Sequence, residues 1–246
     1  MAFYKDDPVL KAAALAPAHP ITQLPPAGTT LGAIARTHNA VGGLIEKAAA
    51  AIGVEPMAVL AVWHVESGTL PYIPGKPVLR FENHKFWSGW GENHAAVFDR
   101  HFRFGGHGAT GASWKNHTFR NPVTGPWRSF HGTQTKEYEV FNFASTLATK
   151  EAACLACSFG GPQIMGFNHD KCGYRDACSL FDAFGADLRW QVLGFFDFVT
   201  TTDCVRHIRT RQWERFGACY NGNGPVYGPL IAAAFALKAQ FLALPR

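Results

Sequence analysis

The stretch AVLAVWHVESGTL, residues 58–70, places one carboxylic acid, Glu66, at the end of a long apolar run. Residues 56–65 carry no charged side chain and are apolar on most faces, which is typical of a buried helix. A carboxyl group at the end of such a helix loses solvation, and this loss raises its pKa by disfavouring the ionised form. Glu66 is therefore a candidate proton donor near neutral pH. The alternative from position alone is a glutamate that caps the helix and points into solvent.

The residues before this stretch predict an arm followed by helices. Residues 1–38 are rich in Ala, Pro and Thr, and APAHPITQLPPAGTT carries four prolines, which is typical of an extended arm. A helix is expected from about Asn39 to Gly53, and Pro56 suits the first turn of the next helix. We therefore divide the chain into an N-terminal arm, residues 1–38, and one domain, residues 39–246.

The residues after this stretch predict a short extended insertion and then more helices. PVLRFE, residues 77–82, is a strand candidate, and residues 88–135 show little helical period. The expected fold class is mainly α, with a small extended or β insertion after the helix that carries Glu66. From Lys136 onward helical periodicity predicts helices over residues 136–156, 175–184, 187–201, 203–217 and 226–243.

The composition fits a folded globular protein with a weak attraction to anionic surfaces. The chain has 246 residues, 47% of them hydrophobic, which is enough for a substantial core. Its 23 basic and 18 acidic residues give a net charge of +5, and the basic residues form no block. This pattern favours loose attraction to an anionic cell-wall polymer and gives little support to nucleic-acid binding.

The N-terminal sequence MAFYKDDPVLKAAALAP has two acids and no uninterrupted apolar core, so no secretory signal peptide is expected. We also expect no later run of 18 apolar residues that would span a membrane, and so no stable membrane insertion. The expected localisation is synthesis in the cytoplasm. Any target outside the cell, such as the wall, would then be reached through holin-type release or injection.

Six cysteines occupy the C-terminal part of the chain, at positions 154, 157, 172, 178, 204 and 219. The first four could supply the thiolates of a structural zinc site, and disulfides formed after export are a second possibility. We favour reduced core thiols. Cys154 and Cys157 lie in an apolar helical segment, where a small thiol packs much as alanine does, and the spacer from Cys172 to Cys178 is longer than zinc sites usually have.

Glu82, at the end of PVLRFE, is the most obvious second carboxylate. Hydrolysis of a sugar bond needs one acid that protonates the leaving oxygen, while a second carboxylate, where one is used, stays ionised. A strand that folds back beside the Glu66 helix would place Glu82 across a shallow groove. The alternative is that Arg80, which shares a strand face with Glu82, pairs with it and leaves Glu82 only to pin the strand.

Two glycine-rich loops carry further polar candidates. SFGGPQIMGFNH, residues 158–169, has glycines that let the backbone approach a ligand, and a buried Gln163 must satisfy its amide by bridging segments or touching substrate. The alternative for Gln163 is a cap in a helix-to-helix turn. In ACYNGNG, residues 218–224, Tyr220 is either a core aromatic or a hydroxyl aimed into a site.

Three segments in the order VESG, SFGGPQIMGFNH and FGACYNGNG resemble the signatures of the lysozyme-like superfamily, as in goose-type lysozymes and lytic transglycosylases. More specifically, VWHVESG, PVLRFENHKFW, SFGGPQIMGFNH and RFGACYNGNG resemble the N-acetylmuramidase family of phage endolysins and related lytic effectors. The resemblance covers about residues 39–244, and its most specific element is the Gln-Ile-Met-Gly loop. It implies an α+β lysozyme-like fold.

The resemblance also implies a function and a set of site residues. The implied enzyme is a monomeric glycosidase without cofactor or metal, which cleaves the β-1,4 bond between N-acetylmuramic acid and N-acetylglucosamine in peptidoglycan. Its general acid would be Glu66, and Glu82 matches the acid that follows the family's strand, where it would position water. The residues implied in substrate binding are Ser67, Gln163, Ile164 and Met165 in the glycan groove, and Tyr220 and Asn221 beside the acid.

Other functions stay open at this point. A lytic transglycosylase would use one acid and form 1,6-anhydro products, and a non-catalytic wall-binding protein could retain the same fold. A zinc peptidase is weakly supported, because the eleven histidines form no His-Glu-x-x-His motif. The chain departs from the family in two respects: no separate wall-binding module is visible, and residues 113–134 do not align with the family pattern.

Overall fold

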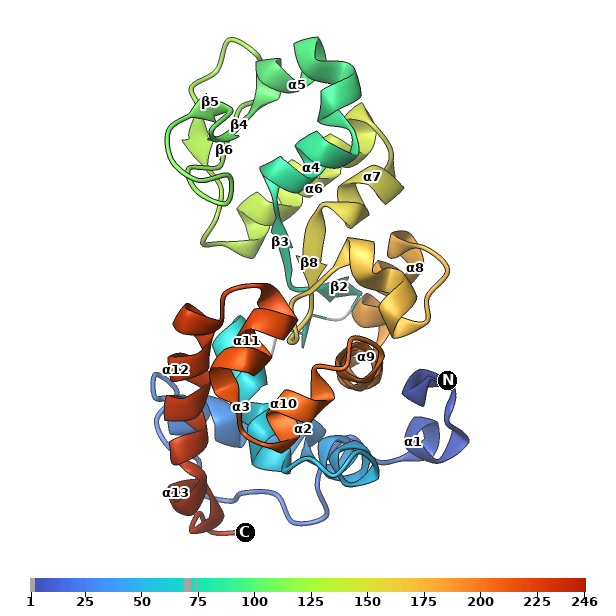
Figure 1. Ribbon diagram of the computed structural model, residues 1–246, viewed down its shortest axis with the longest axis vertical. Helices are drawn as coiled ribbons and strands as arrows, with labels where there is room; N and C mark the ends of the chain where they lie inside the picture. Colours follow the sequence, from blue (N-terminus) through green and yellow to red (C-terminus); the bar gives the residue numbers. More distant parts are fainter. Residues whose placement is uncertain (1–2, 69–71, 74) are drawn as a thin grey trace.

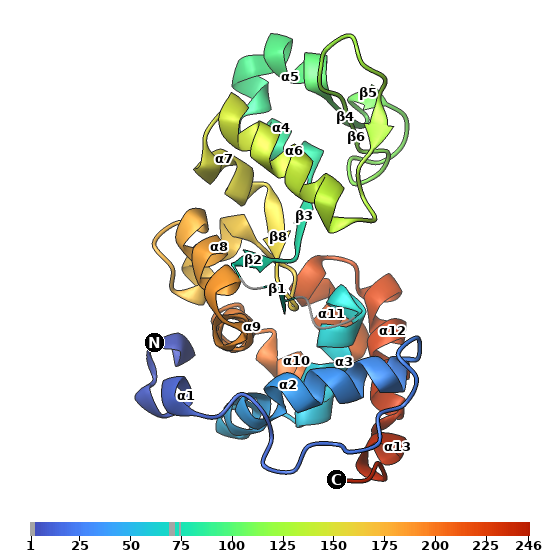
Figure 2. The same ribbon diagram turned by 180° about the vertical axis from the view of Figure 1, so that it is seen from behind.

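The computed structural model describes residues 3–68, 72–73 and 75–246. Figures 1 and 2 show a larger lobe that holds both chain ends and a smaller lobe joined to it by a narrow waist. Helices make up most of both lobes, which confirms the mainly α fold class. The larger lobe and the waist contain η1 (Tyr4–Asp6), α1 (Pro8–Ala12), α2 (Thr30–Ala51), α3 (Pro56–Ser67), η3 (Gly166–Cys172), α8 (Ala177–Ala186), α9 (Leu188–Thr201), α10 (Val205–Arg209), α11 (Trp213–Asn221), α12 (Gly224–Ala236) and α13 (Lys238–Leu242).

The small β insertion is divided among three sheets. The waist holds one antiparallel pair and one sheet of order β3-β8-β9, while the smaller lobe holds a sheet of order β5-β4-β6-β7. The predicted strand at residues 77–82 is confirmed in its central part. The strands are β1 (Tyr72–Ile73), β2 (Lys76–Pro77), β3 (Leu79–Phe81), β4 (Phe102–Gly105), β5 (Gly108–Ala109), β6 (Thr118–Phe119), β7 (Arg128–Ser129), β8 (Cys157–Phe159) and β9 (Ile164–Met165).

The smaller lobe contains helices α4 (Asn83–Gly89), η2 (Gly91–His94), α5 (Ala95–His101), α6 (Gln134–Leu147) and α7 (Lys150–Leu155). Residues 88–135 lack a helical period in the sequence. Between the end of α4 and the start of α6 they form one short α-helix, one 3-10 helix and four short strands. The core of this lobe is aromatic, and its fully buried members include Phe81, Phe86, Phe98, Phe102 and Phe119. Six- to seven-residue helices and two-residue strands are too short to show a clear hydrophobic period, because periodicity needs longer windows.

Helix α2 begins earlier than the sequence suggests. The Thr29 side chain accepts a hydrogen bond from the Gly32 backbone N–H and so caps the helix at Thr30. The expected start at Asn39 is therefore wrong, and the proposed boundary after residue 38 falls inside α2. The preceding prolines obscured the apolar stripe, which already starts at Ala33 and Ile34 in the core.

The N-terminal arm is tied to the body of the protein by hydrogen bonds. Asp197 in α9 accepts hydrogen bonds from the backbone N–H groups of Tyr4 and Lys5. The Asn39 side chain pairs with both the N–H and the carbonyl of Ile21, at 2.8 Å each. Residues of the arm therefore wrap the larger lobe with defined contacts.

Several long predicted helices are interrupted. The prediction over residues 136–156 breaks between α6 and α7 at Ala148, which has φ −115° and ψ −100°. The prediction over residues 203–217 divides into α10 and α11 next to Arg211, whose φ is 57°. Such backbone conformations do not fit a helix, and they reflect tertiary packing that local periodicity does not report.

The C-terminal helical segment, Gly224–Leu242, corrects the expectation that no run would span a membrane. It has 19 residues and a mean hydropathy of 1.2, so by length and composition alone it could cross one. In the folded chain it packs against α3 and α11, with Gly228 and Ile231 buried. Core helices of soluble proteins meet the same criteria, so the segment by itself does not indicate membrane insertion.

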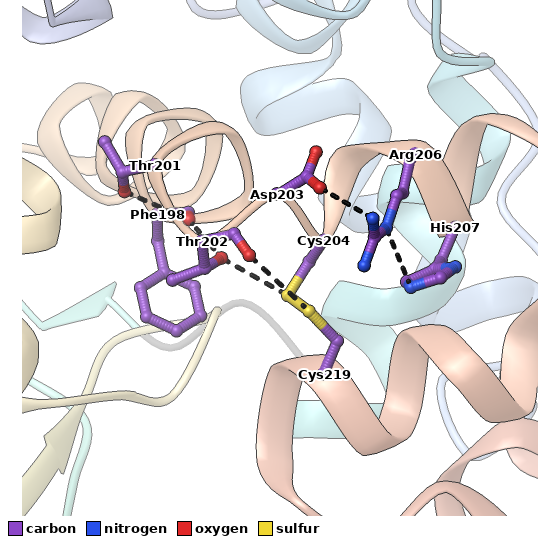
Figure 3. The surroundings of a disulfide bond; sticks show 8 residues. All are labelled: Phe198, Thr201, Thr202, Asp203, Cys204, Arg206, His207 and Cys219. Carbon is purple, nitrogen blue, oxygen red and sulfur yellow. Dashed lines mark hydrogen bonds and ion pairs between the residues drawn. A yellow bond between two sulfur atoms is a disulfide. The ribbon is translucent and has the colours of Figure 1, made fainter.

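A disulfide joins Cys204 and Cys219, with Cα atoms 5.7 Å apart (Figure 3). The expectation of reduced thiols is therefore wrong for this pair. Cys204 lies just before α10 and Cys219 lies in α11. The packing of these two helices brings the cysteines within bonding distance. The other four cysteines are free thiols: Cys154, Cys157, Cys172 and Cys178. Among the described residues, none of them belongs to a group of three side chains that could bind a metal ion.

Candidate active site

Glu66 lies in the last turn of α3, a helix of the larger lobe (Figure 1). The buried run from Met57 to Trp63 fixes the helix, and Gly68 ends it with φ 72°, where its N–H donates to the His64 carbonyl oxygen at 2.7 Å. This conformation is easy for glycine and costly for other residues. The Glu66 side chain is therefore held in place by a buried helix and a defined helix end.

The environment of Glu66 favours its protonated form. Burial raises the pKa of its carboxyl group from 4.5 to about 8, while a hydrogen bond from Asn221 opposes the rise. The Nδ2 atom of Asn221 lies 3.3 Å from Oε1 of Glu66. A carboxylic acid that keeps its proton at neutral pH can act as a general acid.

Helix α11 supplies two of the residues predicted from the sequence. Asn221 is its last residue and reaches Glu66, while Tyr220 packs its ring on Phe216 at 5.2 Å between centroids. The Tyr220 hydroxyl donates a hydrogen bond of 2.6 Å to the Pro162 carbonyl oxygen. Tyr220 is therefore both a core aromatic and a polar link between α11 and the loop that precedes β9.

The loop between β8 and β9 packs directly on α3. A Cβ atom added to Gly161 would lie 1.9 Å from the Trp63 indole ring, so only glycine fits at this approach. The Gly161 N–H donates to Oε1 of Gln191 in α9 at 2.9 Å. The loop is thus fixed against the helix that carries Glu66, one turn before the carboxyl group.

Gln163 uses its amide inside this loop. Its Oε1 accepts from the Ser158 hydroxyl at 2.8 Å, and its Nε2 donates to the Gly160 carbonyl oxygen at 2.7 Å. Its backbone has φ 48°, so the residue closes a tight turn. These side-chain contacts are local to the β8–β9 segment, so they do not connect separate segments, and a role of Gln163 in substrate binding stays a prediction.

The remaining predicted binding residues have different surroundings. Ile164 is buried and pairs with Phe159, so its side chain faces the core, while Met165 is half-buried and pairs with Ser158. The Ser67 hydroxyl donates to the Trp63 carbonyl oxygen at 3.0 Å. The structure thus brings Asn221 into contact with Glu66 and places Tyr220 next to Asn221 in α11, while the Ile164 side chain belongs to the core.

Glu82 lies at the junction of β3 and α4. Its Oε1 accepts a 2.7 Å hydrogen bond from Arg80 Nε, which confirms the pairing of these two residues. Its Oε2 faces the Nδ1 atoms of His84 and His117, at 3.5 and 3.3 Å. Burial lowers the pKa of His117, and it lowers that of His84 to about 4, so both rings are neutral at neutral pH despite the nearby carboxylate.

The pKa of the Tyr227 hydroxyl is influenced by both Glu66 and Glu82. Burial is the main reason why the pKa of Tyr227 in α12 is raised, and the charges of Glu66 and Glu82 raise it further, while Arg80 lowers it. The pKa of Tyr227 therefore depends on both catalytic candidates of the sequence.

Sequence reasoning missed several residues of this region. They pack or position the candidates and carry no motif of their own; they are Trp63, His84, His117, His131, Gln191 and Tyr227. The available signal for Trp63 was the glycine pair in SFGGPQIMGFNH, since a glycine at a close approach requires a bulky partner.

The chain is similar to proteins of one known family. A family model described as Muramidase, N-acetylmuramidase, matches residues 55–228. Among solved structures, the chain is similar to the crystal structure of Burkholderia AP3 phage endolysin, at 25% sequence identity and a TM-score of 0.59. That match covers 81% of this chain and 70% of the other. No curated protein sequence matches the chain.

Proposed function

This chain belongs to the N-acetylmuramidase family, and we propose that it hydrolyses the β-1,4 bond between N-acetylmuramic acid and N-acetylglucosamine, with Glu66 as the general acid. The chain is a peptidoglycan hydrolase of the glycosidase type. The observation that carries the finer proposal is the Glu66 carboxyl group, which is partly buried at the end of α3 and hydrogen-bonded by Asn221.

The chemistry of the bond explains why such a carboxyl group is needed. The glycosidic oxygen leaves poorly until it is protonated, and positive charge develops on the sugar ring as the bond breaks. The Glu66 carboxyl group, whose pKa is about 8, still carries its proton at neutral pH and can transfer it to that oxygen. In ionised form Glu66 can then help to stabilise the positive ring.

For the second step we propose that Glu82 positions the attacking water. Its carboxylate lies on the β3–α4 side of the waist, while Glu66 comes from α3 in the larger lobe. Arg80 donates to Oε1 of Glu82 at 2.7 Å and so fixes the position of this carboxyl group. Ser67, Gln163 and Met165 belong to the segments we propose to bind the glycan.

A lytic transglycosylase is the second candidate. One observation favours it: both oxygens of Glu82 are already engaged or enclosed, Oε1 by Arg80 and Oε2 among His84 and His117. If Glu82 has no role, Glu66 alone must act, and the C6 hydroxyl of the muramic acid attacks in place of water. The product is then a 1,6-anhydro sugar.

We further propose that the protein acts on the cell wall as a monomer without a cofactor. The net charge of +5 would favour loose association with anionic wall polymer. Its named structural neighbour is a phage endolysin, which supports a role in wall lysis after release to the wall.

Product analysis tests the proposed reaction. Purified peptidoglycan is digested, the products are reduced with borohydride, and mass spectrometry identifies the reduced terminal sugar. The proposal predicts reduced N-acetylmuramic acid and a gain of one water for each cleavage. Anhydro-muramic acid ends would support the transglycosylase, and reduced N-acetylglucosamine would contradict the assigned bond.

A further inference from the structure

A cluster of three potential metal ligands, which does not include Glu66, lies where the smaller lobe meets strand β3. One ligand atom from each of Glu82, His117 and His131 falls within 4.8 Å of the other two. Glu82 follows β3, His117 precedes β6, and His131 lies just before α6. The cluster therefore connects three segments that are distant in the sequence.

The outer hydrogen bonds of the two histidines fix the roles of their ring nitrogens. Nε2 of His117 lies 2.8 Å from the Ser113 carbonyl oxygen, and Nδ1 of His131 lies 2.8 Å from Oε1 of Glu137. Because a carbonyl or carboxylate oxygen only accepts, each of these ring nitrogens must donate. In the neutral rings, the lone pairs then sit on Nδ1 of His117 and Nε2 of His131.

These two lone pairs face each other. Nδ1 of His117 and Nε2 of His131 are 3.2 Å apart, and Oε2 of Glu82 is 3.3 Å from the same Nδ1. Oε2 of Glu82 is buried and accepts no hydrogen bond from the described part of the chain. The His117 side chain is fully buried, with 0% of its surface exposed. Three potential metal-ligand atoms thus converge in one place, and a bound cation would relieve the repulsion between their lone pairs.

We propose that Oε2 of Glu82, Nδ1 of His117 and Nε2 of His131 bind one divalent transition-metal ion, with Zn²⁺ as the best fit. Zinc takes imidazole nitrogen and carboxylate oxygen at about 2.0 Å in a tetrahedron, which places neighbouring ligand atoms about 3.3 Å apart. Two of the three separations, 3.2 and 3.3 Å, match this spacing, and the third pair, Glu82 and His131, lies within 4.8 Å. Two imidazole ligands disfavour Mg²⁺ and Ca²⁺, which prefer oxygen.

The surroundings have the features of a built metal site. Each histidine donates its second ring N–H to a carbonyl or carboxylate, the arrangement that orients metal-bound imidazole in proteins. Arg80 occupies only Oε1 of Glu82 and leaves Oε2 for the metal. The side chains of Glu82 and His131 are 14% and 19% exposed, so the fourth position of the ion can be taken by water.

A bound ion would fasten the β3–α4 junction to the segments that lead into β6 and α6. Because these ligands are brought together only in the folded chain, the ion would stabilise the folded state of the smaller lobe. The site shares Glu82, the residue proposed to position water, but not Glu66, and metal binding is measured directly, so the existence of the site can be tested without a glycosidase assay.

The test is zinc binding to the full chain after treatment with a chelator. Isothermal titration calorimetry with ZnCl₂ should give one high-affinity site per chain, and zinc should raise the thermal unfolding midpoint. His131→Gln and His117→Gln should each weaken zinc binding by at least about 100-fold, since losing even an outer partner of a ligand costs about 10- to 100-fold. His107→Gln, an imidazole paired with Asp99 outside the cluster, should leave affinity unchanged.

Two further measurements keep the outcome clear. Co²⁺ replaces Zn²⁺ as a spectroscopic probe, and the proposed ligands predict tetrahedral bands without thiolate charge-transfer absorption, which excludes binding to Cys154 and Cys178. Thermal unfolding of metal-free His131→Gln tests whether this position, whose side chain is 19% exposed, tolerates the change, even if the fully buried His117 does not. Absence of a tight site in the unmodified chain, thiolate absorption with Co²⁺, or unaltered affinity in a folded His131→Gln variant would each overturn the proposal.

Discussion

Asn221 at the end of α11 donates a hydrogen bond from Nδ2 to Oε1 of Glu66 at the end of α3, at 3.3 Å and across 155 positions of sequence. This contact joins two of the motifs that resemble the N-acetylmuramidase family. It also acts directly on the proton of Glu66, because a hydrogen bond to the ionised carboxylate lowers its pKa against the effect of burial.

Removing this contact should shift the pH dependence of activity. In Asn221→Ala the pKa of Glu66 rises further, so the acid stays protonated to higher pH and the alkaline limb of the kcat/KM profile moves upward. The measurement is the rate of reducing-end release across pH. Asn223→Ala, an exposed neighbour without a side-chain cap bond to α12, is the matched control and should keep the original profile. A downward shift in Asn221→Ala would contradict this role.

The raised pKa of Glu66 also predicts a pH-dependent stability. The folded state holds the proton more tightly than the unfolded state, so the stability contributed by this group is full below pH 4.5 and declines up to about pH 8. Asp197, whose pKa burial raises to about 7, acts in the same direction. The effect of Glu66 is isolated by Glu66→Gln, which should gain thermal stability over the unmodified chain as pH rises from 5 to 8. A difference that is constant with pH would argue against a buried acid.

Gly161→Ala should damage the site through packing. The new methyl group would meet the Trp63 indole, so the loop or the ring must move. Such overpacking costs about 1–3 kcal/mol of unfolding free energy. Activity should fall by more than the lost stability alone explains. The loop carries Gln163, and its Pro162 carbonyl oxygen accepts the hydrogen bond from the Tyr220 hydroxyl. Gly89→Ala, where a methyl group meets nothing within 4 Å, is the control, and equal effects of the two changes would refute the argument.

The disulfide should support α11, the helix that presents Tyr220 and Asn221. Cys219 directly precedes these residues and is bonded to Cys204, at a separation of 15 residues. The double change Cys204→Ser and Cys219→Ser should lower the free energy of unfolding by about 3 kcal/mol, measured by chemical denaturation. Cys178→Ser, at a partly exposed free thiol, should cost much less. Similar losses in both variants would show that the bond does not stabilise the chain.

Local patterns predicted the elements whose information is contained in one segment. The uncharged run ending in Glu66 identified α3, and PVLRFE identified β3 and the pairing of Arg80 with Glu82. The mainly α fold and the peptidoglycan hydrolase class followed from these segments together with the family resemblance. Each of these predictions depends on residues that are neighbours in the sequence.

Features that depend on distant packing could not be predicted. The cluster around Oε2 of Glu82 includes histidines from two other segments, and the sequence positions of the three residues match no metal-ligand motif. The Cys204–Cys219 bond depends on how α10 and α11 pack. The start of α2 was missed because the capping residue, Thr29, directly follows a proline-rich run that indicates an extended arm. Local periodicity carries no information on such contacts.

The central claim is that Glu66 supplies the proton for cleavage of peptidoglycan. The most direct measurement compares reducing-end release from purified peptidoglycan by the unmodified chain, Glu66→Gln, and the control Glu92→Gln at an exposed acid. Glu66→Gln should lose at least about 100-fold in this rate, the low end of what general acid catalysis contributes, with intact folding by circular dichroism. Glu92→Gln should retain full activity. A folded Glu66→Gln variant that releases reducing ends at the unmodified rate would contradict the account.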